Sequence, residues 1–146
     1  MLVIIHCYTD GSCKKNGKTG ATGGYGVVVV EDGKIIRQYQ KFSNNTTNNR
    51  EELKAIIWAT LHYPKCVIHS DSQYAINVFQ KWMYGWERNN WIKSDNKVPE
   101  NLDLIKAYYQ LVTSNEYQVL FEYVKGHNGD SYNEMADKLA TGEILL

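Results

Sequence analysis

Two acidic residues of this chain come directly after stretches that are predicted to be strands. Asp10 follows the β-rich residues 2–9, and Asp71 follows the short apolar run Cys66–Ser70. If these strands are parallel neighbours, the two carboxylates converge at one edge of a sheet, where like charges repel unless a cation or a proton lies between them. Carboxylate oxygens without a nearby cysteine ligand favour a hard cation, Mg²⁺ or Mn²⁺. Taken singly, each acid also has a structural interpretation, Asp10 as an Asp-Gly turn and Asp71 as a helix N-cap.

A predicted helix after Asn48 carries two further acids, Glu51 and Glu52. The segment Asn48–Glu51 resembles a capping box, with Asn48 as the N-cap and Glu51 at the third helical position, which gives Glu51 a structural role. At about 100° per residue, Glu51 points about 150° from the middle of the apolar stripe and Glu52 about 110°. Glu52 therefore flanks the buried face and is better placed to reach the end of the sheet.

The last predicted helix presents the same choice between a capping acid and a second acid. The segment Ser131–Glu134 reads as a capping box, which accounts for Glu134. Asp137 lies about 130° from the apolar centre of this helix, against about 170° for Glu134, so the preference for Asp137 is mild. An exposed acid on a helix usually belongs to a solvated face. Four acids at one sheet edge would suit a two-metal site, in which one metal activates a water and the other stabilises the leaving oxygen of a phosphodiester.

The hydrophobic pattern predicts the elements that hold these acids. An Asp-Gly turn at residues 31–34 joins two β-runs and indicates a hairpin. The pattern then changes to helical spacing and alternates between helices and short strands. The resulting order, βββ-α-β-α-(α)-α-β-α, predicts an α/β fold with a mixed sheet and helices packed on it. The predicted strands are residues 2–9, Tyr25–Val30, Ile35–Phe42, Cys66–Ser70 and Gln118–Val124, and the helices lie around residues 53–61, 75–83, 104–112 and 132–140.

Length, composition and charge restrict the class of protein. The 146 residues fit one domain, residues 1–146. With 16 basic and 16 acidic residues the net charge is zero, which counts against a strong non-specific nucleic-acid binder but leaves room for a local basic patch. Three cysteines without zinc-like spacing indicate reduced thiols in a cytoplasmic protein. The N-terminus lacks the pattern of a signal peptide, and no apolar run reaches membrane-spanning length.

Taken together and in this order, the motifs of the chain resemble those of type I ribonuclease H. They extend from the first predicted strand to the last predicted helix, and their joint presence makes coincidence implausible. The resemblance implies a ribonuclease H-like fold, with a five-stranded mixed sheet whose first three strands are antiparallel, flanked by helices. The matching segments are Tyr8–Cys13, Gly23–Gly26, Thr46–Leu53, Asp71–Tyr74, Val124–Gly129 and Asn133–Asp137.

The resemblance also implies an activity, the metal-dependent hydrolysis of the RNA strand of an RNA–DNA hybrid that leaves 5′-phosphate and 3′-hydroxyl ends. It implies two Mg²⁺ ions, for which Mn²⁺ can substitute, with the first acid bridging both. His127 matches the family's loop histidine, which assists proton transfer or product release near neutral pH. The alternative for His127 is an exposed loop histidine. The implied metal-binding and catalytic acids are Asp10, Glu52, Asp71 and Asp137.

Several polar residues match the positions at which the family contacts the hybrid near the cut strand. Amides and backbone groups are suited to reading the 2′-hydroxyl, which distinguishes RNA from DNA. The alternative is that these residues form a polar loop and a helix cap. The matching positions are Cys13, Asn16, Thr47, Asn48, Asn49 and Gln73.

The segment from residue 81 to residue 97 interleaves basic and aromatic residues and resembles the basic protrusion that grips the DNA strand. Trp86, Arg88 and Lys93 are its candidate contacts, whereas Trp82 sits on an apolar helical stripe and is predicted to pack in the core. Gly85 stands where the family often has a phosphate-holding amide, and the segment is less basic than in strongly basic relatives. We therefore expect weaker and more salt-sensitive binding of the hybrid.

Two other functions compete with this interpretation. One is a catalytically weak or inactive module of the same fold that only binds hybrids, although the chain keeps all four acids and the histidine. The other is a related nuclease with a different substrate, such as a junction-specific ribonuclease or a DNase. We also expect a monomer with no obligate protein partner and no association with membranes.

Overall fold

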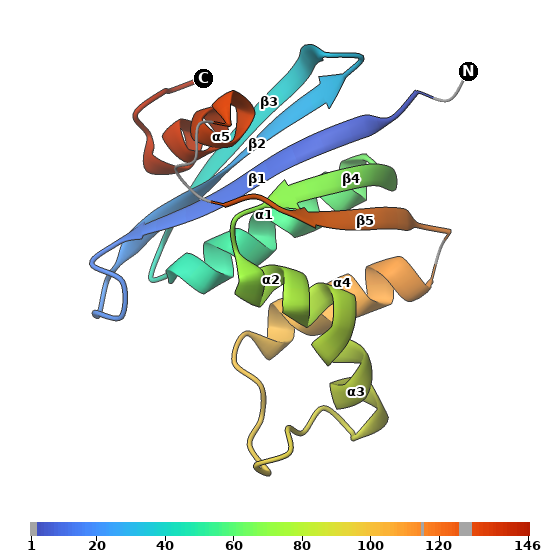
Figure 1. Ribbon diagram of the computed structural model, residues 1–146. Helices are drawn as coiled ribbons and strands as arrows, with labels where there is room; N and C mark the ends of the chain where they lie inside the picture. The colour runs from blue at the N-terminus through green and yellow to red at the C-terminus, as the bar shows by residue number, and fades with distance from the viewer. Residues whose placement is uncertain (1–2, 115, 126–129) are drawn as a thin grey trace.

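The computed structural model describes residues 3–114, 116–125 and 130–146, and its centre is one twisted sheet (Figure 1). The sheet has five strands in the order β3-β2-β1-β4-β5. The β1–β2 and β2–β3 pairs are antiparallel, and the β1–β4 and β4–β5 pairs are parallel. The predicted mixed sheet with three antiparallel strands is therefore confirmed. Its strands are β1 (Ile5–Lys14), β2 (Thr22–Glu31), β3 (Lys34–Asn44), β4 (Lys65–Ser70) and β5 (Gln118–Tyr123).

Helices cover the two faces of the sheet unequally (Figure 1). Of the helices in the described residues, α5 alone lies on one face, and the others lie on the opposite face. The single helix predicted near residues 75–83 consists of three segments, because a π-helical turn, η1, separates α2 from α3. No helix in the described part of the chain is long and apolar enough to cross a bilayer. The helical segments are α1 (Asn48–His62), α2 (Gln73–Asn77), η1 (Val78–Trp82), α3 (Met83–Arg88), α4 (Leu102–Thr113) and α5 (Ser131–Thr141).

Each face of the sheet has its own apolar cluster. The larger cluster joins β1, β2 and β4 to the helices around α1, and Leu53 and Ile56 are fully buried in it. The smaller cluster contains Val28, Val30, Ala136 and Leu139 under α5. A Cβ at Gly26 of β2 would lie 2.5 Å from the carbonyl oxygen of Ala136, so only glycine lets α5 approach this closely. The close approach holds α5 directly on β2.

The first strand is longer than its Asp-Gly-Ser sequence indicates. Asp10 was expected to end it, but β1 continues to Lys14 because β2 continues beside it and its backbone hydrogen bonds outweigh the local preference for a turn. The neighbour β4 stops earlier, and its last pair with β1 is Thr9–Ser70. Asp10 is therefore the first residue of β1 beyond the parallel pairing, and Asp71 directly follows the end of β4.

The predicted hairpin between β2 and β3 is present. Asp32 and Gly33 have φ values of 52° and 74°, and both are left-handed, as a two-residue hairpin turn requires. All three cysteines are free thiols, and Cys7 and Cys66 are buried.

Candidate active site

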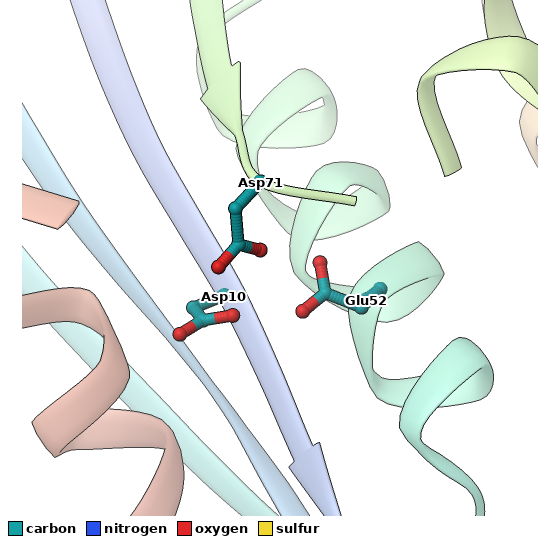
Figure 2. A group of neighbouring side chains, drawn as sticks. All are labelled: Asp10, Glu52 and Asp71. Carbon is teal, nitrogen blue, oxygen red and sulfur yellow. The ribbon is translucent and has the colours of Figure 1, made fainter. Parts of the chain in front are cut away.

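Three carboxylates meet where β4 ends and β1 continues. Asp10, Glu52 and Asp71 each offer an oxygen atom, and these atoms lie within 4.8 Å of one another. Figure 2 shows that they come from three separate elements, namely β1, α1 and the residue after β4. Asp137 of α5 lines the same cavity of about 450 Å³. The structure thus brings together the acids that were singled out in the sequence.

The backbone of Gly11 joins two of these acids. Its N–H donates to Glu52 Oε1 at 2.7 Å and lies 2.9 Å from Asp10 Oδ1. A Cβ at Gly11 would lie 2.5 Å from the carbonyl carbon of Glu51, so a larger residue has no room between β1 and α1. Contact between strand and helix backbones therefore sets the position of Glu52 relative to Asp10.

Helix α1 begins one residue earlier than expected. Its N-cap is Thr47, whose side chain accepts a hydrogen bond from Arg50 N at 3.1 Å, so the predicted cap at Asn48 is wrong. Thr47 has the extended backbone that an N-cap needs, with φ −136° and ψ 162°. Asn48 is the first helical residue, and the capping box that assigned a role to Glu51 does not form.

Glu51 is a buried structural acid, although for another reason than capping. It is completely buried, its Oε2 accepts a hydrogen bond from the Thr46 hydroxyl at 2.7 Å, and the same oxygen pairs with Lys54 Nζ at 2.7 Å. These partners occupy Glu51 away from the carboxylate cavity, while its neighbour Glu52 lines that cavity.

Helix α5 also has a different cap from the predicted one. Asp130 is the N-cap and accepts hydrogen bonds from Tyr132 N and Asn133 N, both at 3.0 Å, so the predicted cap at Ser131 is wrong. A carboxylate at this position also interacts favourably with the helix dipole, which the Ser131 hydroxyl cannot do. Glu134 is exposed, whereas Asp137 is half-buried at the cavity.

Burial and crowding change the protonation of the acids. Burial, the hydrogen bond and charge of Glu52, and the charge of Asp71 raise the pKa of Asp10 to about 11. Burial and the charge of Asp71 also raise the pKa of Glu52 to about 7, although hydrogen bonds from Asp10 and the Gly11 N–H favour its charged form. Without a cation, Asp10 therefore keeps a proton at neutral pH and donates it to Glu52. A hydrogen bond with Asp137 favours this proton too.

The donor set fits a hard divalent cation. Among the described residues, two buried carboxylate oxygens have no hydrogen-bond partner, Glu51 Oε1 and Glu52 Oε2, and of these two acids only Glu52 lines the carboxylate cavity. The group that could hold an ion contains carboxylate oxygens and no sulfur or imidazole ligand. Oxygen-only sites suit Mg²⁺ and Mn²⁺, and a cation would relieve the repulsion that now requires a shared proton.

Most of the predicted substrate-contact residues gather around the first turn of α1. Cys13 and Asn48 line the carboxylate cavity. Asn16 Oδ1 accepts a hydrogen bond from Asn48 N at 3.0 Å, which ties the loop after β1 to this turn. Asn49 is exposed beside them, and Gln73 is exposed as the first residue of α2. Their roles in binding remain predictions.

The protrusion differs from expectation at one aromatic residue. Trp82 is 40% exposed, so the prediction that it packs in the core is wrong. It ends the π-helical turn, whose wider repeat rotates Trp82 away from the apolar stripe that ideal α-helical spacing predicts. Trp86 is half-buried against the main core instead, Arg88 is exposed, and Lys93 Nζ lies 3.8 Å from Asp95. His127 lies outside the described residues.

A histidine pair beside the carboxylates was not anticipated. His6 Nδ1 and His69 Nε2 are 2.8 Å apart, and Tyr8 stacks on His69 with ring centroids 4.2 Å apart. Burial and the neighbouring His6 lower the pKa of His69. Strand alternation could have shown that His6, Tyr8 and Asp10 share one face of β1, but it does not place a residue of β4 against them.

Comparison with known proteins identifies the family. A sequence model of the RNase H family matches residues 4–144, nearly the whole chain. The chain belongs to the ribonuclease H family. Ribonuclease H of Caldanaerobacter subterraneus subsp. tengcongensis is 41% identical over 145 residues, which are 97% of this chain and 91% of the relative. Ribonuclease H of Thiobacillus denitrificans is 39% identical, with 97% and 94% covered.

Solved ribonuclease H structures share the fold. LC9-RNase H1, described as a type 1 RNase H with the type 2 active-site motif, superposes with a TM-score of 0.79 and 32% identity over 94% of this chain and 70% of that one. The PFV RNase H domain superposes with a TM-score of 0.77 at 22% identity, covering 94% and 92%. The predicted type I ribonuclease H and its fold are confirmed. The ribonuclease H relatives support the prediction that this chain is a nuclease.

Proposed function

We propose that this ribonuclease H is a metal-dependent endoribonuclease that hydrolyses the RNA strand of RNA–DNA hybrids. The observation that carries the proposal is the meeting of Asp10, Glu52 and Asp71 in a cavity that Asp137 also lines. A protein of the same fold, LC11-RNase H1, has been solved in complex with an RNA/DNA hybrid and superposes with a TM-score of 0.67 at 19% identity. That complex supports a hybrid as the substrate.

The proposed cofactor is a pair of Mg²⁺ ions, for which Mn²⁺ can substitute, held by the four acids. When bound, the ions would activate the attacking water and stabilise the leaving oxygen, so that cleavage leaves 5′-phosphate and 3′-hydroxyl ends. The unpartnered oxygen of Glu52 and the like charges around it support a bound cation. The acids in question are Asp10, Glu52, Asp71 and Asp137.

The protein's own groups prepare this site. The Gly11 N–H holds Glu52 in place, and the burial of Asp10 and Glu52 keeps competing water away from both carboxylates. A cation held by these acids would favour the ionised forms of Asp10 and Glu52, so that the proton they share would be released. We assign His127 to proton transfer or product release, as its position in the family implies.

Recognition of the hybrid is proposed to divide between two surfaces. Residues around the first turn of α1 and the start of α2 would contact the hybrid near the cut strand, where amide groups can read the 2′-hydroxyl. The protrusion that carries Trp86, Arg88 and Lys93 would hold the DNA strand. The Lys93–Asp95 pair reduces the free positive charge there and supports weaker binding of the DNA strand. The first surface comprises Cys13, Asn16, Thr47, Asn48, Asn49 and Gln73.

We further propose a single catalytic domain, residues 1–146, that works as a monomer in the cytoplasm without an obligate protein partner. The described carboxylates of the site all come from one chain, and the three free thiols suit a reducing compartment. A single monomeric species in light scattering that keeps full cleavage activity is the expected result.

The decisive experiment measures cleavage of an end-labelled RNA–DNA hybrid with and without Mg²⁺. Duplex DNA, duplex RNA and single-stranded RNA serve as control substrates. We expect cleavage only of the RNA strand of the hybrid, only with metal, and its loss in Asp71→Asn. Glu134→Gln removes an exposed acid of α5 one turn from the cavity and should keep full activity. A wild-type protein that binds the hybrid but never cuts it would instead be a hybrid-binding module, and metal-dependent cutting of duplex DNA would make it a DNase.

A further inference from the structure

A second cavity of about 360 Å³ lies beside the carboxylate cavity and shares Ser12 with it. None of the residues predicted to contact substrate lines it. The strand ladders bring its floor together, because Lys14 pairs with Thr22 and Thr22 pairs with Asn44 across β1, β2 and β3. Phe42 and Thr141 complete the walls.

This cavity continues the carboxylate site in one direction. Alternate residues of a strand face the same side, so Asp10, Ser12 and Lys14 form one row along β1. On α5, Asp137 and Thr141 are one turn apart, and each lines one of the two cavities. At about 3.3 Å per residue, Lys14 is about 13 Å along the strand from Asp10. One extended ligand could therefore occupy both cavities, with different parts of it in each.

The walls suit an anion that carries hydroxyl groups. No carboxylate lines the cavity among the described residues, and Lys14 has no ion pair with any of them. Helix α5 ends at this cavity, and the partial negative charge of its last carbonyl groups favours hydrogen-bond donors. A phosphate therefore fits near Lys14, and a hydroxyl that can donate fits near Thr141.

We propose that this cavity binds the cut RNA strand a short distance from the scissile phosphate, with one phosphate on Lys14 and a ribose hydroxyl near Ser12 and Thr141. The ribose 2′-hydroxyl both donates and accepts, which matches these walls and is absent from DNA. The opposite strand is assigned to the protrusion with Trp86 and Arg88 (Figure 1). This inference rests on the proposed function.

The test compares Lys14→Gln with Lys34→Gln, which also removes an exposed charge but at the opposite end of the β2–β3 ladder. Hybrid binding is measured in an Asp71→Asn background, across salt concentrations. One phosphate contact contributes about 0.9 to the slope of log affinity against log salt, so Lys14→Gln should bind about eightfold more weakly at 0.1 M salt and equally at 1 M. In the active protein, KM should rise by a similar factor with kcat unchanged.

Neutral methylphosphonate linkages, placed one at a time along each strand, identify the contact. One linkage in the RNA strand should weaken wild-type binding and leave Lys14→Gln unaffected. The inference is overturned if Lys14→Gln keeps the salt slope of Lys34→Gln, or if only linkages in the DNA strand couple to Lys14. Wild-type cleavage of the hybrid is measured in parallel. Its absence would refute the proposed function, whereas normal cleavage with an unchanged slope would refute this inference alone.

Discussion

The histidine pair and the carboxylate group lie near each other along β1 and β4, yet they accommodate crowding in opposite ways. His6 Nδ1 and His69 Nε2 lie 2.8 Å apart, within hydrogen-bonding distance of each other. Asp10 and Glu52 can also share a proton, but the charge of Asp71 acts on both of them. The two histidines can therefore hydrogen-bond to each other, whereas the three carboxylates repel one another unless a proton or a cation lies between them.

This difference distinguishes the histidine pair, a structural cluster, from the carboxylate group, a candidate binding site. Glu51 Oε1, like Glu52 Oε2, is buried without a partner among the described residues, so an unpartnered oxygen does not by itself mark a binding site. The gathering of Asp10, Glu52 and Asp71 is what favours a bound cation, because their like charges repel. The two clusters should therefore respond differently to metal and oppositely to pH.

The largest expected effect is on catalysis. Asp10→Asn removes the central carboxylate and should lower the single-turnover cleavage rate in Mg²⁺ by about 10³-fold or more, because a metal-assisted transition state gains several kcal/mol from the ions. Quenched-flow measurement on the hybrid gives the rate. His69→Phe should stay within a few fold of wild type, since the ring stack on Tyr8 can be kept. A comparable loss of cleavage rate in Asp10→Asn and His69→Phe would show that the carboxylate group and the histidine pair do not differ in function.

The second expected effect is thermal. At Mg²⁺ concentrations about 100 times Kd, binding should stabilise the protein by about 2.7 kcal/mol and raise Tm by roughly 5–10 °C. Scanning calorimetry in Mg²⁺ and in EDTA measures the shift. His69→Phe should retain the shift and Glu52→Gln should lose most of it. An equal shift in wild type and Glu52→Gln would show that the ion binds elsewhere.

The third effect is the pH dependence of the metal-free protein. The folded-state pKa of Glu52, about 7, exceeds its unfolded value, as does the pKa of Asp10. Their contribution to stability is therefore fully present below about pH 4 and is lost as pH rises through the folded-state values. In EDTA, Asp10→Asn should be more stable than wild type at pH 8 by on the order of 1–3 kcal/mol. Urea unfolding from pH 5 to pH 8 tests this, and a wild type that gains stability over that range contradicts it.

The smallest effect is the opposite pH response of the histidine pair. Burial and His6 lower the pKa of His69 below its unfolded value, while the nearby acids Glu122 and Asp130 partly oppose the shift. Its contribution is present above about pH 6.5 and is lost as pH falls through the folded-state pKa. Between pH 7 and pH 5, His69→Phe should lose less stability than wild type, because it has no group here whose protonation is favoured in the unfolded state. Equal slopes in urea titrations of the two proteins would count against a lowered pKa of His69.

The sequence predicted the sheet well because its information is local and periodic. Strand alternation, the Asp-Gly hairpin and helical spacing are properties of neighbouring residues, and the observed strand order follows the resemblance that these motifs carry. The length of β1 was underestimated because its continuation depends on the ladder with β2, a contact that no single segment encodes.

The sequence predicted which acids gather at the site, but it did not predict the local geometry around them. The choice of Glu52 over Glu51 rested partly on a capping box at Asn48 that does not form, since the threonine before it caps the helix. Trp82 was placed by ideal helical spacing, which the π-helical turn interrupts. The histidine pair depends on the register between β1 and β4, which becomes visible only in three dimensions.

Gly11 has a consequence for how this site can vary. Its N–H holds Glu52, and its Cα hydrogen occupies a space in which even one methyl group would meet the backbone of α1. Strand β1 and helix α1 are therefore so close that only a hydrogen atom fits between them at Gly11. This contact also sets the distance between Asp10 and Glu52. Any larger side chain would have to push the helix outward, so the spacing of the Asp10 and Glu52 carboxylates is set by the main chain.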